Sequence, residues 1–386
     1  MDFRLTEDQQ AYTETARAFS EGVLAPNAAQ WDAQQIFPKE VLKQAGDLGF
    51  MGIYTPTAAG GLGLGRLDTS LIVEELAKGC TSTAAFLTIH NMATSMIGKY
   101  GQPGLIEEWC PPLIRGEKLA SYCLTEANAG SDAGSLRCTA KRDGDNYLVS
   151  GSKIFISGGG ETEMLVVMLR TGKEGPKGIS AFAIAADLPG IEYGKKERKM
   201  GWNSQPTRAI HFDNVRIPAK NLLGVEGQGF NIAMEGLDGG RLNIATCSIG
   251  TAQAALQAAI EYSRGRKQFG QAIADFQATR FKLADMATVL VAARQMVRLA
   301  AFKLDHNEAE ATAFCAMAKR FATDAGFNIC NDALQIHGGY GYMKELPLER
   351  YVRDCRVHQI LEGTNEIMRV IISRRLLIEG VMEMIK

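Results

Sequence analysis

The sequence lacks an excess of either charge, and it lacks any long apolar run. Its 42 basic and 43 acidic side chains nearly cancel, so no net field attracts nucleic acid or anionic lipid. No apolar stretch reaches the roughly 18 residues that a membrane-spanning helix needs. We therefore expect neither a nucleic-acid nor a membrane partner, and an anionic ligand would need a local cluster of basic groups and amide donors.

Cysteine and histidine are too scattered to suggest a metal centre. The chain has eight cysteines and five histidines, and no two cysteines stand two or three positions apart, as zinc ligands often do. A chain of 386 residues has no need of the disulfides that stabilise much smaller secreted domains. We interpret the cysteines as buried thiols in a reducing compartment and expect no metal.

The N-terminal residues do not look like a targeting signal. They lack the basic start and apolar run of a secretory signal, and they lack the arginine-rich, acid-poor composition of a transit peptide. We therefore expect a soluble intracellular protein. It would lie in the cytoplasm if the source is bacterial, and in the mitochondrial matrix if the chain is a mature eukaryotic protein.

Residues 1–120 are expected to form a helical block. Thr6 and Gln9 match a capping box, in which each side chain bonds the backbone amide of the other residue. Pro38 suits the first turn of a second helix that carries apolar residues on one face, and Gly49 ends that helix.

A third helix is expected over residues 70–78, with Gly79 as its C-cap. The glycine-rich segment 60–65 lacks the spacing of a dinucleotide fingerprint and the acidic residue expected about 20 positions later. We interpret it as a loop.

The pattern changes to short apolar runs and turn residues over residues 121–226. The clearest strand-like runs are 147–149, 154–156, 164–169, 181–185 and 209–212. Strands at this spacing, with no helices between them, indicate an antiparallel barrel or sandwich. We expect the middle domain to be an antiparallel β-barrel.

The remainder, residues 227–386, is helical again. Long helices are expected over residues 230–264, 277–304, 308–337 and 364–385. Within the second of these, residues 281–304 are apolar nearly all round, as in a helix buried inside a bundle. The expected fold is therefore mostly α with a β insert: an N-terminal helical domain, a middle β-barrel domain and a C-terminal four-helix bundle. A cleft is expected where the three domains meet.

The strongest local signal is the segment 360–366, Ile-Leu-Glu-Gly-Thr-Asn-Glu. Glu362 precedes a helix that begins at Thr364, a good N-cap, and Gly363 lets a ligand approach the backbone. Taken alone, Glu362 is more typical of an acid that interacts with a helix dipole than of a catalyst. The whole segment, near the C-terminus, changes that interpretation.

At these residues the chain resembles the acyl-CoA dehydrogenase family, in which an E-G-[TS]-x-[EQ] segment supplies the catalytic glutamate. Four further segments resemble the family in the same order, namely 122–132, 155–157, 266–270 and 335–339. Each is moderate evidence alone, but five in order across the whole chain are very hard to reach by chance. The resemblance implies that Glu362 removes the α-proton of an acyl-CoA.

The chemistry explains these residue types. An acyl-CoA α-hydrogen is a very weak acid, so its removal needs a base in a dry pocket and stabilisation of the developing enolate. Burial should raise the pKa of Glu362 and make it a better proton acceptor near neutral pH. The β-hydrogen would leave as a hydride to a flavin on the opposite side of the Cα–Cβ bond.

The resemblance also implies FAD as the cofactor. Thr125 and Ser157 would hydrogen-bond the flavin ring, and Phe155 would cover one face of it. The segments 266–270 and 335–339 reach the FAD of a neighbouring subunit in the family, so a homotetramer arranged as a dimer of dimers is implied. The cofactor-binding residues carried over are Tyr122, Leu124, Thr125, Ser131, Phe155, Ile156, Ser157, Arg266, Phe269, Phe276, Gln277, Gln335, Gly338, Gly339, Thr364 and Glu366.

Further residues resemble the family's substrate contacts. The backbone amide of Glu362 would bond the thioester oxygen, and Arg241 suits an anionic or hydrogen-bonding ligand. The substrate-binding residues carried over are Ser131, Asp238, Arg241, Gly363 and Arg374. The expected electron acceptor is electron transfer flavoprotein.

Two positions depart from the family pattern. Ala127 and Asn128 replace its usual Pro-Gly pair, which loosens the turn and is expected to weaken FAD or acyl-CoA binding somewhat. Because Asn tolerates a left-handed backbone, we expect the turn to survive. Ala272 replaces a common proline, with little expected effect.

The identity of the acyl group is less well determined. Some family members carry the base immediately before the arginine matched by Arg241, but Gly240 stands there and cannot act as a base. The resemblance is closest to members that oxidise isobutyryl-CoA, and Gly239 with Gly240 is expected to leave room for an α-branched chain. Short straight-chain and 2-methylbutyryl substrates remain alternatives. A flavin oxidase and a non-catalytic scaffold are rival functions.

Overall fold

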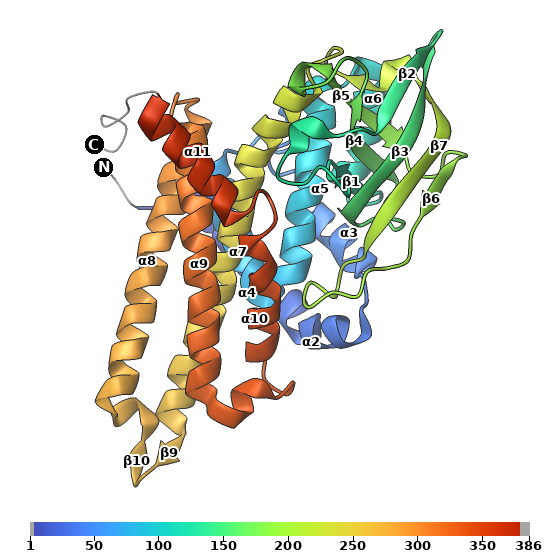
Figure 1. Ribbon diagram of the computed structural model, residues 1–386. Coiled ribbons are helices and arrows are strands. Elements are labelled where there is room, and N and C mark those ends of the chain that lie inside the picture. Colours follow the sequence, from blue (N-terminus) through green and yellow to red (C-terminus); the bar gives the residue numbers. More distant parts are fainter. Residues whose placement is uncertain (1–3, 379–386) are drawn as a thin grey trace.

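The computed structural model describes residues 4–378, and Figure 1 shows two helical blocks with a β-sheet at one side of them. A π-helical turn, Ser20–Leu24, joins the first two helices of the N-terminal block. The helices of this block are α1 (Glu7–Phe19), α2 (Ala25–Gln34), α3 (Lys39–Asp47), α4 (Arg66–Gly79), α5 (Thr81–Tyr100) and α6 (Pro103–Ile114).

The capping box at the start of α1 is confirmed. The amide of Gln9 donates to Oγ1 of Thr6, and the amide of Thr6 donates to Oε1 of Gln9, both at 3.2 Å. The glycine-rich segment 60–65 is a loop, as expected. It leads directly into α4, which starts four residues earlier than the sequence predicted.

The early start of α4 has a tertiary cause. The carboxylate of Asp305 accepts the amides of Arg66 and Leu67 at 2.6 and 3.0 Å. A capping carboxylate satisfies first-turn amides that otherwise have no helical acceptor. Because Asp305 lies in a distant part of the chain, no local pattern around residue 66 could reveal this cap.

The middle of the chain forms one sheet of eight strands. Its order is β6-β7-β3-β2-β4-β5-β8, with β1 paired to β4 outside this path. The strands are β1 (Ala120–Cys123), β2 (Thr139–Asp143), β3 (Asn146–Ser157), β4 (Met164–Arg170), β5 (Ile179–Ala185), β6 (Ile191–Tyr193), β7 (Thr207–Pro218) and β8 (Leu222–Leu223). The predicted runs 147–149 and 154–156 belong to the single strand β3.

The predicted antiparallel barrel is wrong, because the sheet is mixed and open. β1 runs parallel to β4, and β2 pairs with β4 in parallel at Thr139 and Arg170. Closure would require the two outer strands to pair along their length, but β6 has three residues and β8 has two. The apolar runs indicated strands correctly, whereas strand direction depends on connections that the runs do not encode.

The C-terminal block contains three long helices, and the chain then turns back through α10 into α11. The bounds are α7 (Gly229–Gly265), α8 (Gln277–Asp305), α9 (Ala311–His337), α10 (Leu348–Arg356) and α11 (Asn365–Ile378), with the two-stranded hairpin β9 (Lys267–Gln268) and β10 (Gln271–Ala272) between α7 and α8. The sequence did not predict α10. The part of the expected helix 364–385 beyond residue 378 lies outside the described residues.

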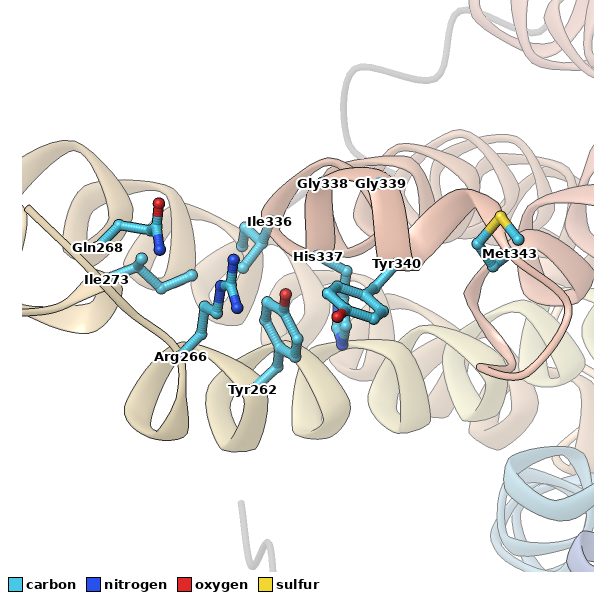
Figure 2. A pocket seen from close by; sticks show the side chains of 10 residues that line it. All are labelled: Tyr262, Arg266, Gln268, Ile273, Ile336, His337, Gly338, Gly339, Tyr340 and Met343. Atoms are coloured by element: carbon cyan, nitrogen blue, oxygen red, sulfur yellow. The ribbon is translucent and has the colours of Figure 1, made fainter.

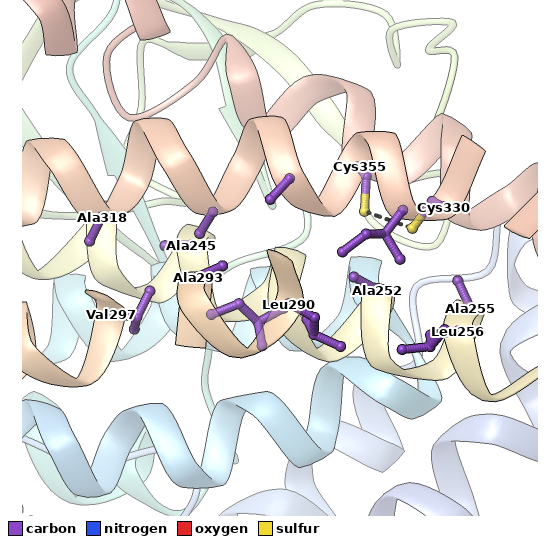
Figure 3. Packing of buried hydrophobic residues seen from close by; sticks show 14 of the residues in the cluster. Ala245, Ala252, Ala255, Leu256, Leu290, Ala293, Val297, Ala318, Cys330 and Cys355 are labelled. Carbon is purple, nitrogen blue, oxygen red and sulfur yellow. Dashed lines mark hydrogen bonds between the residues drawn. The ribbon is translucent and has the colours of Figure 1, made fainter. Parts of the chain in front are cut away.

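Small side chains dominate the core between α7, α8 and α9 (Figure 3). Ala245, Ala252, Ala293 and Ala318 are almost completely buried there, and side chains of this size let helix backbones approach closely. All eight cysteines are free and buried, as expected. No helix within residues 4–378 is long and apolar enough to cross a membrane.

The prediction that residues 281–304 form a helix buried all round is wrong for this chain. One face of α8 packs into the core, but Phe281, Val291 and Phe302 on the other face have exposed fractions of 59%, 53% and 46%. α8 packs on α4, α7 and α9, and the face that carries these three side chains is left exposed within the described chain.

Candidate active site

Glu362 lies in the short loop between a 3-10 turn, Val357–Gln359, and α11. Its φ is +55°, and Gly363 follows with a φ of +85°. Positive φ is unfavourable for any residue with a side chain, and such strain often occurs at functional sites. The oxygen Oγ1 of Thr364 accepts the amide of Ile367 at 3.3 Å, so the predicted N-cap of α11 is confirmed.

The carboxylate of Glu362 is directed inward against α7. A Cβ atom on Gly240 would lie 2.5 Å from Oε2 of Glu362, so only glycine leaves room for the carboxylate. Oε2 is buried and has no hydrogen-bond partner among the described residues. Burial raises the pKa of Glu362 to about 7, although the positive charges of Arg241 and Lys319 oppose this rise.

Arg241 and Asp238 lie one turn apart on α7. Nη1 of Arg241 donates to Oδ1 of Asp238 at 2.5 Å, and Oγ1 of Thr312 donates to Oδ2 at 2.6 Å. Nε of Arg241 is buried without a partner in the part of the chain that the structure describes. An unpaired buried donor is costly, so the arrangement fits a ligand that accepts from Arg241.

The expected flavin-binding segments of the β-domain lie side by side. The amide of Ile154 donates to the carbonyl of Thr125 at 2.9 Å, and Oγ of Ser121 donates to the carbonyl of Ser157 at 2.6 Å. Phe155 is 64% exposed and has a φ of +58°. An exposed aromatic ring held on a strained strand residue fits contact with a planar ligand.

Other predicted residues of this region differ in their surroundings. The hydroxyl of Tyr122 is buried without a partner among the described residues, and burial together with Glu362 raises its pKa. Leu124 is half-buried, and its carbonyl accepts Nζ of Lys153 at 3.0 Å. The side chain of Ile156 packs in the core of the sheet, so only its backbone is available to a ligand.

The turn that lacks the family's Pro-Gly pair is intact. Glu126 and Ala129 exchange backbone hydrogen bonds of 3.1 Å in both directions, and the φ of Asn128 is negative. The expected survival of the turn is therefore confirmed, but the expected left-handed asparagine is not its cause. The carboxylate of Glu126 also accepts Nζ of Lys153 at 2.7 Å. Ser131 lies exposed beyond the turn.

A second group of predicted residues lines a pocket of about 380 Å³ at the far end of α9 (Figure 2). Arg266, Gly338 and Gly339 were predicted from the sequence. Gln268, Ile336 and His337 also line the pocket and belong to the predicted segments 266–270 and 335–339, although they were not named individually. Sequence reasoning missed Tyr262, Ile273, Tyr340 and Met343. Tyr262 lies in the last turn of α7, four positions before Arg266, whose amide donates to the Tyr262 carbonyl at 2.8 Å; this spacing was the available signal.

Aromatic contacts shape this pocket. The ring of Tyr262 stacks on that of His337 with centroids 4.3 Å apart, and the guanidinium of Arg266 lies 5.9 Å from the centre of the Tyr340 ring. A cation beside aromatic faces, with two exposed glycines at the end of a helix, suits a ligand that has both a planar ring and a negative charge.

Other predicted residues do not line this pocket: Phe269, Phe276, Gln277 and Gln335 lie near it, whereas those on α11 lie at the other end of the long helices. Phe269 is 92% exposed between β9 and β10, and its ring contacts that of Phe276 edge-on at 6.1 Å. Gln277 and Gln335 are exposed nearby. On α11, Glu366 is exposed and lies 3.6 Å from Arg369, and Arg374 is also exposed.

The two groups of predicted residues do not form one site within this chain. Lys319, which contacts the Glu362 loop, and His337, which lines the pocket, are separated along α9. At a rise of ~1.5 Å per residue, this separation is roughly 27 Å along the helix. Figure 1 likewise shows α11 and the β9–β10 hairpin at opposite ends of the long helices.

Comparisons with known proteins cover nearly the whole chain. The mitochondrial isobutyryl-CoA dehydrogenase of Bos taurus is 52% identical over 375 residues, which are 97% of this chain and 90% of that protein. Family models match residues 6–117 (acyl-CoA dehydrogenase, N-terminal domain), 121–215 (middle domain) and 227–377 (C-terminal domain). The chain belongs to the acyl-CoA dehydrogenase family.

Solved structures of this family share the fold. The butyryl-CoA dehydrogenase of Megasphaera elsdenii matches with a TM-score of 0.94 and 41% identity, covering 98% of this chain and all of the other. A structure described as the electron transferring flavoprotein of Acidaminococcus fermentans includes a chain with a TM-score of 0.95 and 42% identity, at the same coverages. A complex of PigA with FAD and proline has a TM-score of 0.95 and 30% identity, again at those coverages.

As an acyl-CoA dehydrogenase, the protein is an FAD-dependent enzyme. Its residues fit that cofactor. The exposed ring of Phe155 is suited to one face of the flavin, and the unpartnered hydroxyl of Tyr122 lies in the same region as Glu362. The pocket at Arg266 suits the anionic diphosphate and the adenine.

Proposed function

We propose that this acyl-CoA dehydrogenase oxidises isobutyryl-CoA to methacrylyl-CoA, a step of valine breakdown, with Glu362 as the base. The observation that carries the proposal is the inner carboxylate oxygen of Glu362, Oε2, which is buried, lacks a partner among the described residues and lies against Gly240. The isobutyryl-CoA dehydrogenase of Bos taurus, at 52% identity, supports the choice of acyl group.

Glu362 accepts the α-proton. Burial raises its pKa to about 7, which makes the carboxylate a stronger base than an exposed glutamate while leaving about half of it ionised at neutral pH. When bound, FAD supplies the acceptor for the hydride that leaves the β-carbon. The products are an α,β-unsaturated acyl-CoA, reduced flavin and protonated Glu362.

The backbone amide of Glu362 binds the thioester oxygen. Within the described residues, no backbone or side-chain oxygen accepts this amide, and it belongs to the residue that carries the base. An N–H donor beside the carbonyl stabilises the negative charge that develops on the oxygen as the α-proton leaves. The paired Asp238 and Arg241 bind the pantetheine and ribose part of the CoA.

The glycine pair on α7 does not explain a preference for a branched acyl chain. A Cβ on Gly239 would lie 2.4 Å from Cζ of Arg66, and the space beside Gly240 holds the Glu362 carboxylate. The room expected from these two glycines is therefore already filled by protein atoms. The proposal for isobutyryl-CoA rests on the likeness to the relatives instead.

A short straight-chain substrate is the second candidate. The observation that favours it is the likeness to the butyryl-CoA dehydrogenase structure from Megasphaera elsdenii, at 41% identity and a TM-score of 0.94. The same base and cofactor serve either substrate, so only the shape of the acyl pocket separates the two candidates. 2-Methylbutyryl-CoA, which is branched at the α-carbon and longer than isobutyryl-CoA, is a further alternative substrate.

The electron acceptor in this proposal is electron transfer flavoprotein. The structure described as the electron transferring flavoprotein of Acidaminococcus fermentans, which includes a closely similar chain, supports this partner. The compartment follows the source, either the bacterial cytoplasm or the mitochondrial matrix. The Bos taurus relative is a mitochondrial isobutyryl-CoA dehydrogenase.

We also propose that the protein assembles as a homotetramer, a dimer of dimers. The exposed apolar face of α8 and the 92% exposed ring of Phe269 support an assembly that covers them. The separation between Glu362 and the pocket at Arg266 supports a cofactor held by two chains. Each FAD would then lie between the active-site loop of one subunit and the pocket of another.

The test is an anaerobic titration of the FAD-loaded enzyme with isobutyryl-CoA, butyryl-CoA and 2-methylbutyryl-CoA, followed by the flavin absorbance. Fastest bleaching by isobutyryl-CoA, and none in Glu362→Gln, is the expected result. Faster bleaching by butyryl-CoA would keep the base and overturn the proposed substrate. Normal bleaching in Glu362→Gln would overturn the assignment of the base. Rapid reoxidation of the reduced flavin by air would instead favour an oxidase.

A further inference from the structure

A lysine is buried under the loop that carries Glu362. Lys319 lies in the first half of α9 with an exposed fraction of 0%. Its Nζ donates to the carbonyl oxygen of Gly363 at 2.8 Å and to Oδ1 of Asn365 at 2.9 Å. Neutral oxygens therefore hold this ammonium group, and no carboxylate among residues 4–378 forms an ion pair with it. Lysine is rarely buried in this way because its desolvation is costly.

The side chain of Asn365 adds further hydrogen bonds between the Glu362 loop and α9. Its Nδ2 donates to Oγ1 of Thr323 at 3.0 Å and to Oδ1 of Asp324 at 2.8 Å. On the other side of Glu362, Nε2 of Gln359 donates to the same Oδ1 at 2.7 Å. Both ends of the segment 359–365 are therefore fixed to one stretch of α9.

The loop between these two attachments needs an external restraint. The φ of Glu362 is +55° and that of Gly363 is +85°. A free loop rarely adopts a positive φ at a residue other than glycine, so the backbone of Glu362 is strained. The inner carboxylate oxygen of Glu362 has no partner among the described residues, so it cannot hold the loop. The hydrogen bond from Lys319 to the Gly363 carbonyl restrains the residue directly after Glu362, whose backbone is strained.

We propose that Lys319 is a positioning residue for Glu362: its ammonium group fixes the Gly363 carbonyl and thereby the backbone of the base, and its charge favours the ionised carboxylate. The inference deepens the proposed function, because it rests on Glu362 being the base. Lys319 acts through the loop and does not contact the substrate.

The electrostatics of the site agree with this arrangement. Lys319 on α9 and Arg241 on α7 both lower the pKa of Glu362 against the effect of burial, while the Tyr122 hydroxyl faces the carboxylate from β1. Burial lowers the pKa of Lys319 to about 8, so its ammonium form prevails at neutral pH. Loss of this charge would leave Arg241 as the cation that opposes the rise in the pKa of Glu362.

The test compares Lys319→Met, which keeps an unbranched side chain but removes the donor and the charge, with Lys199→Met. Lys199 is a matched control. Its ammonium is also held by neutral acceptors, the carbonyl of Gln205 and Oγ1 of Thr207, and burial lowers its pKa to about 8. Both variants lose one ammonium group that neutral oxygens hold, but only Lys319 contacts the Glu362 loop.

The first measurement is amide hydrogen exchange in the protein without substrate. Lys319→Met should speed exchange at the hydrogen-bonded amides of Ile360 and Leu361 by about tenfold or more, while α7 keeps its protection. Lys199→Met should leave exchange in this loop unchanged. Equal exchange in Lys319→Met and the parent would overturn the proposal. This readout needs no turnover, so it remains valid even if Glu362 proves not to be the base.

The second measurement is kinetic. Lys319→Met should lower kcat by about 100-fold, the scale of a misplaced catalytic group, with KM and FAD content nearly unchanged. The pH of half-maximal kcat should move upward, because loss of the positive charge raises the pKa of Glu362. A fall in thermal stability with an unchanged kcat and pH profile would show a purely structural lysine and refute the proposal.

Lys319→Gln separates the two roles, because it keeps an N–H donor without the charge. We expect it to restore slow exchange in the loop and part of kcat, with the pH profile still shifted upward. If Lys319→Met does not fold, Lys319→Gln is measured in its place. An unshifted pH profile together with parental kcat in Lys319→Gln would then overturn the proposal.

Discussion

Gly240 and Glu362 share one space: a Cβ atom on Gly240 would lie 2.5 Å from Oε2 of the glutamate. The Glu362 carboxylate lies so close to α7 that it fills the space that a side chain at position 240 would need. The sequence had already excluded a base at position 240, because glycine has no functional group. The structure adds that position 240 must stay small for the base at 362 to occupy its place.

Gly240→Ala tests this relationship. The added methyl group should displace the carboxylate and lower kcat by about 100-fold, since a shift of about 1 Å in a catalytic group has an effect of this size. FAD content should stay at the parental level. Steady-state kinetics and the flavin absorbance measure both. Gly104→Ala is the control, because a Cβ there meets nothing within 4 Å.

The pH dependence of kcat follows from the burial of the base. Burial raises the pKa of Glu362 to about 7, and only the ionised carboxylate accepts a proton. Activity should therefore rise about tenfold between pH 6 and pH 8, as the ionised fraction rises through this pKa. A kcat that is flat over this range would contradict the prediction, provided that chemistry limits turnover, which a deuterium isotope effect at the α-carbon establishes.

Glu362→Gln should be more stable than the parent at alkaline pH. Because the pKa of Glu362 is higher in the folded protein than in the unfolded chain, its stabilising contribution is complete below about pH 4.5 and is lost as the pH rises through about 7. Glutamine avoids that loss. Thermal unfolding of the protein without ligands should show a Tm advantage of a few degrees at pH 8 that shrinks toward pH 4.

Arg266→Ala should weaken FAD binding. The guanidinium lines the pocket with Tyr262, Gly338 and Gly339, and loss of a hydrogen bond to a charged group costs about 2 kcal/mol, roughly 30-fold in affinity. Titration of FAD-free protein with FAD measures the change. Lys267→Ala removes the same charge from the adjacent exposed residue, which does not line the pocket, and should leave the affinity near its original value.

Val291→Asp should disrupt the assembly. The side chain lies on the exposed apolar face of α8 with an exposed fraction of 53%, and a buried unpaired carboxylate at an interface is strongly unfavourable. Light scattering after size-exclusion chromatography should show smaller species than in the parent. Lys177→Glu, on an exposed turn of the β-domain, serves as the control. An unchanged mass for Val291→Asp would place α8 outside any interface.

Local patterns predicted much of the fold. The capping box at Thr6 and the N-cap at Thr364 depend on neighbouring residues, so their sequence signals were sufficient. Features set by distant residues were missed. Asp305 moves the start of α4, and the short outer strands β6 and β8 leave the expected barrel open.

The same distinction applies to the candidate site. Glu362 was recognisable because its segment is contiguous, and Arg266 for the same reason. Lys319 was not recognised, because a lysine in a helical sequence usually lies on the surface. Arg66 was also missed. It fills the space beside Gly239 from a different domain, and only the folded chain brings the two together.

The distance between Glu362 and the pocket at Arg266 has a genetic consequence if the proposed sharing of FAD is correct. Two inactive alleles, one encoding Glu362→Gln and the other a protein without Arg266, would complement each other. In a mixed assembly, some sites would combine the intact loop of one product with the intact pocket of the other. Two mutations that both lie in the Glu362 loop, or both in the pocket at Arg266, would fail to complement each other. Complementation tests within this single gene would therefore separate mutations of the loop from mutations of the pocket.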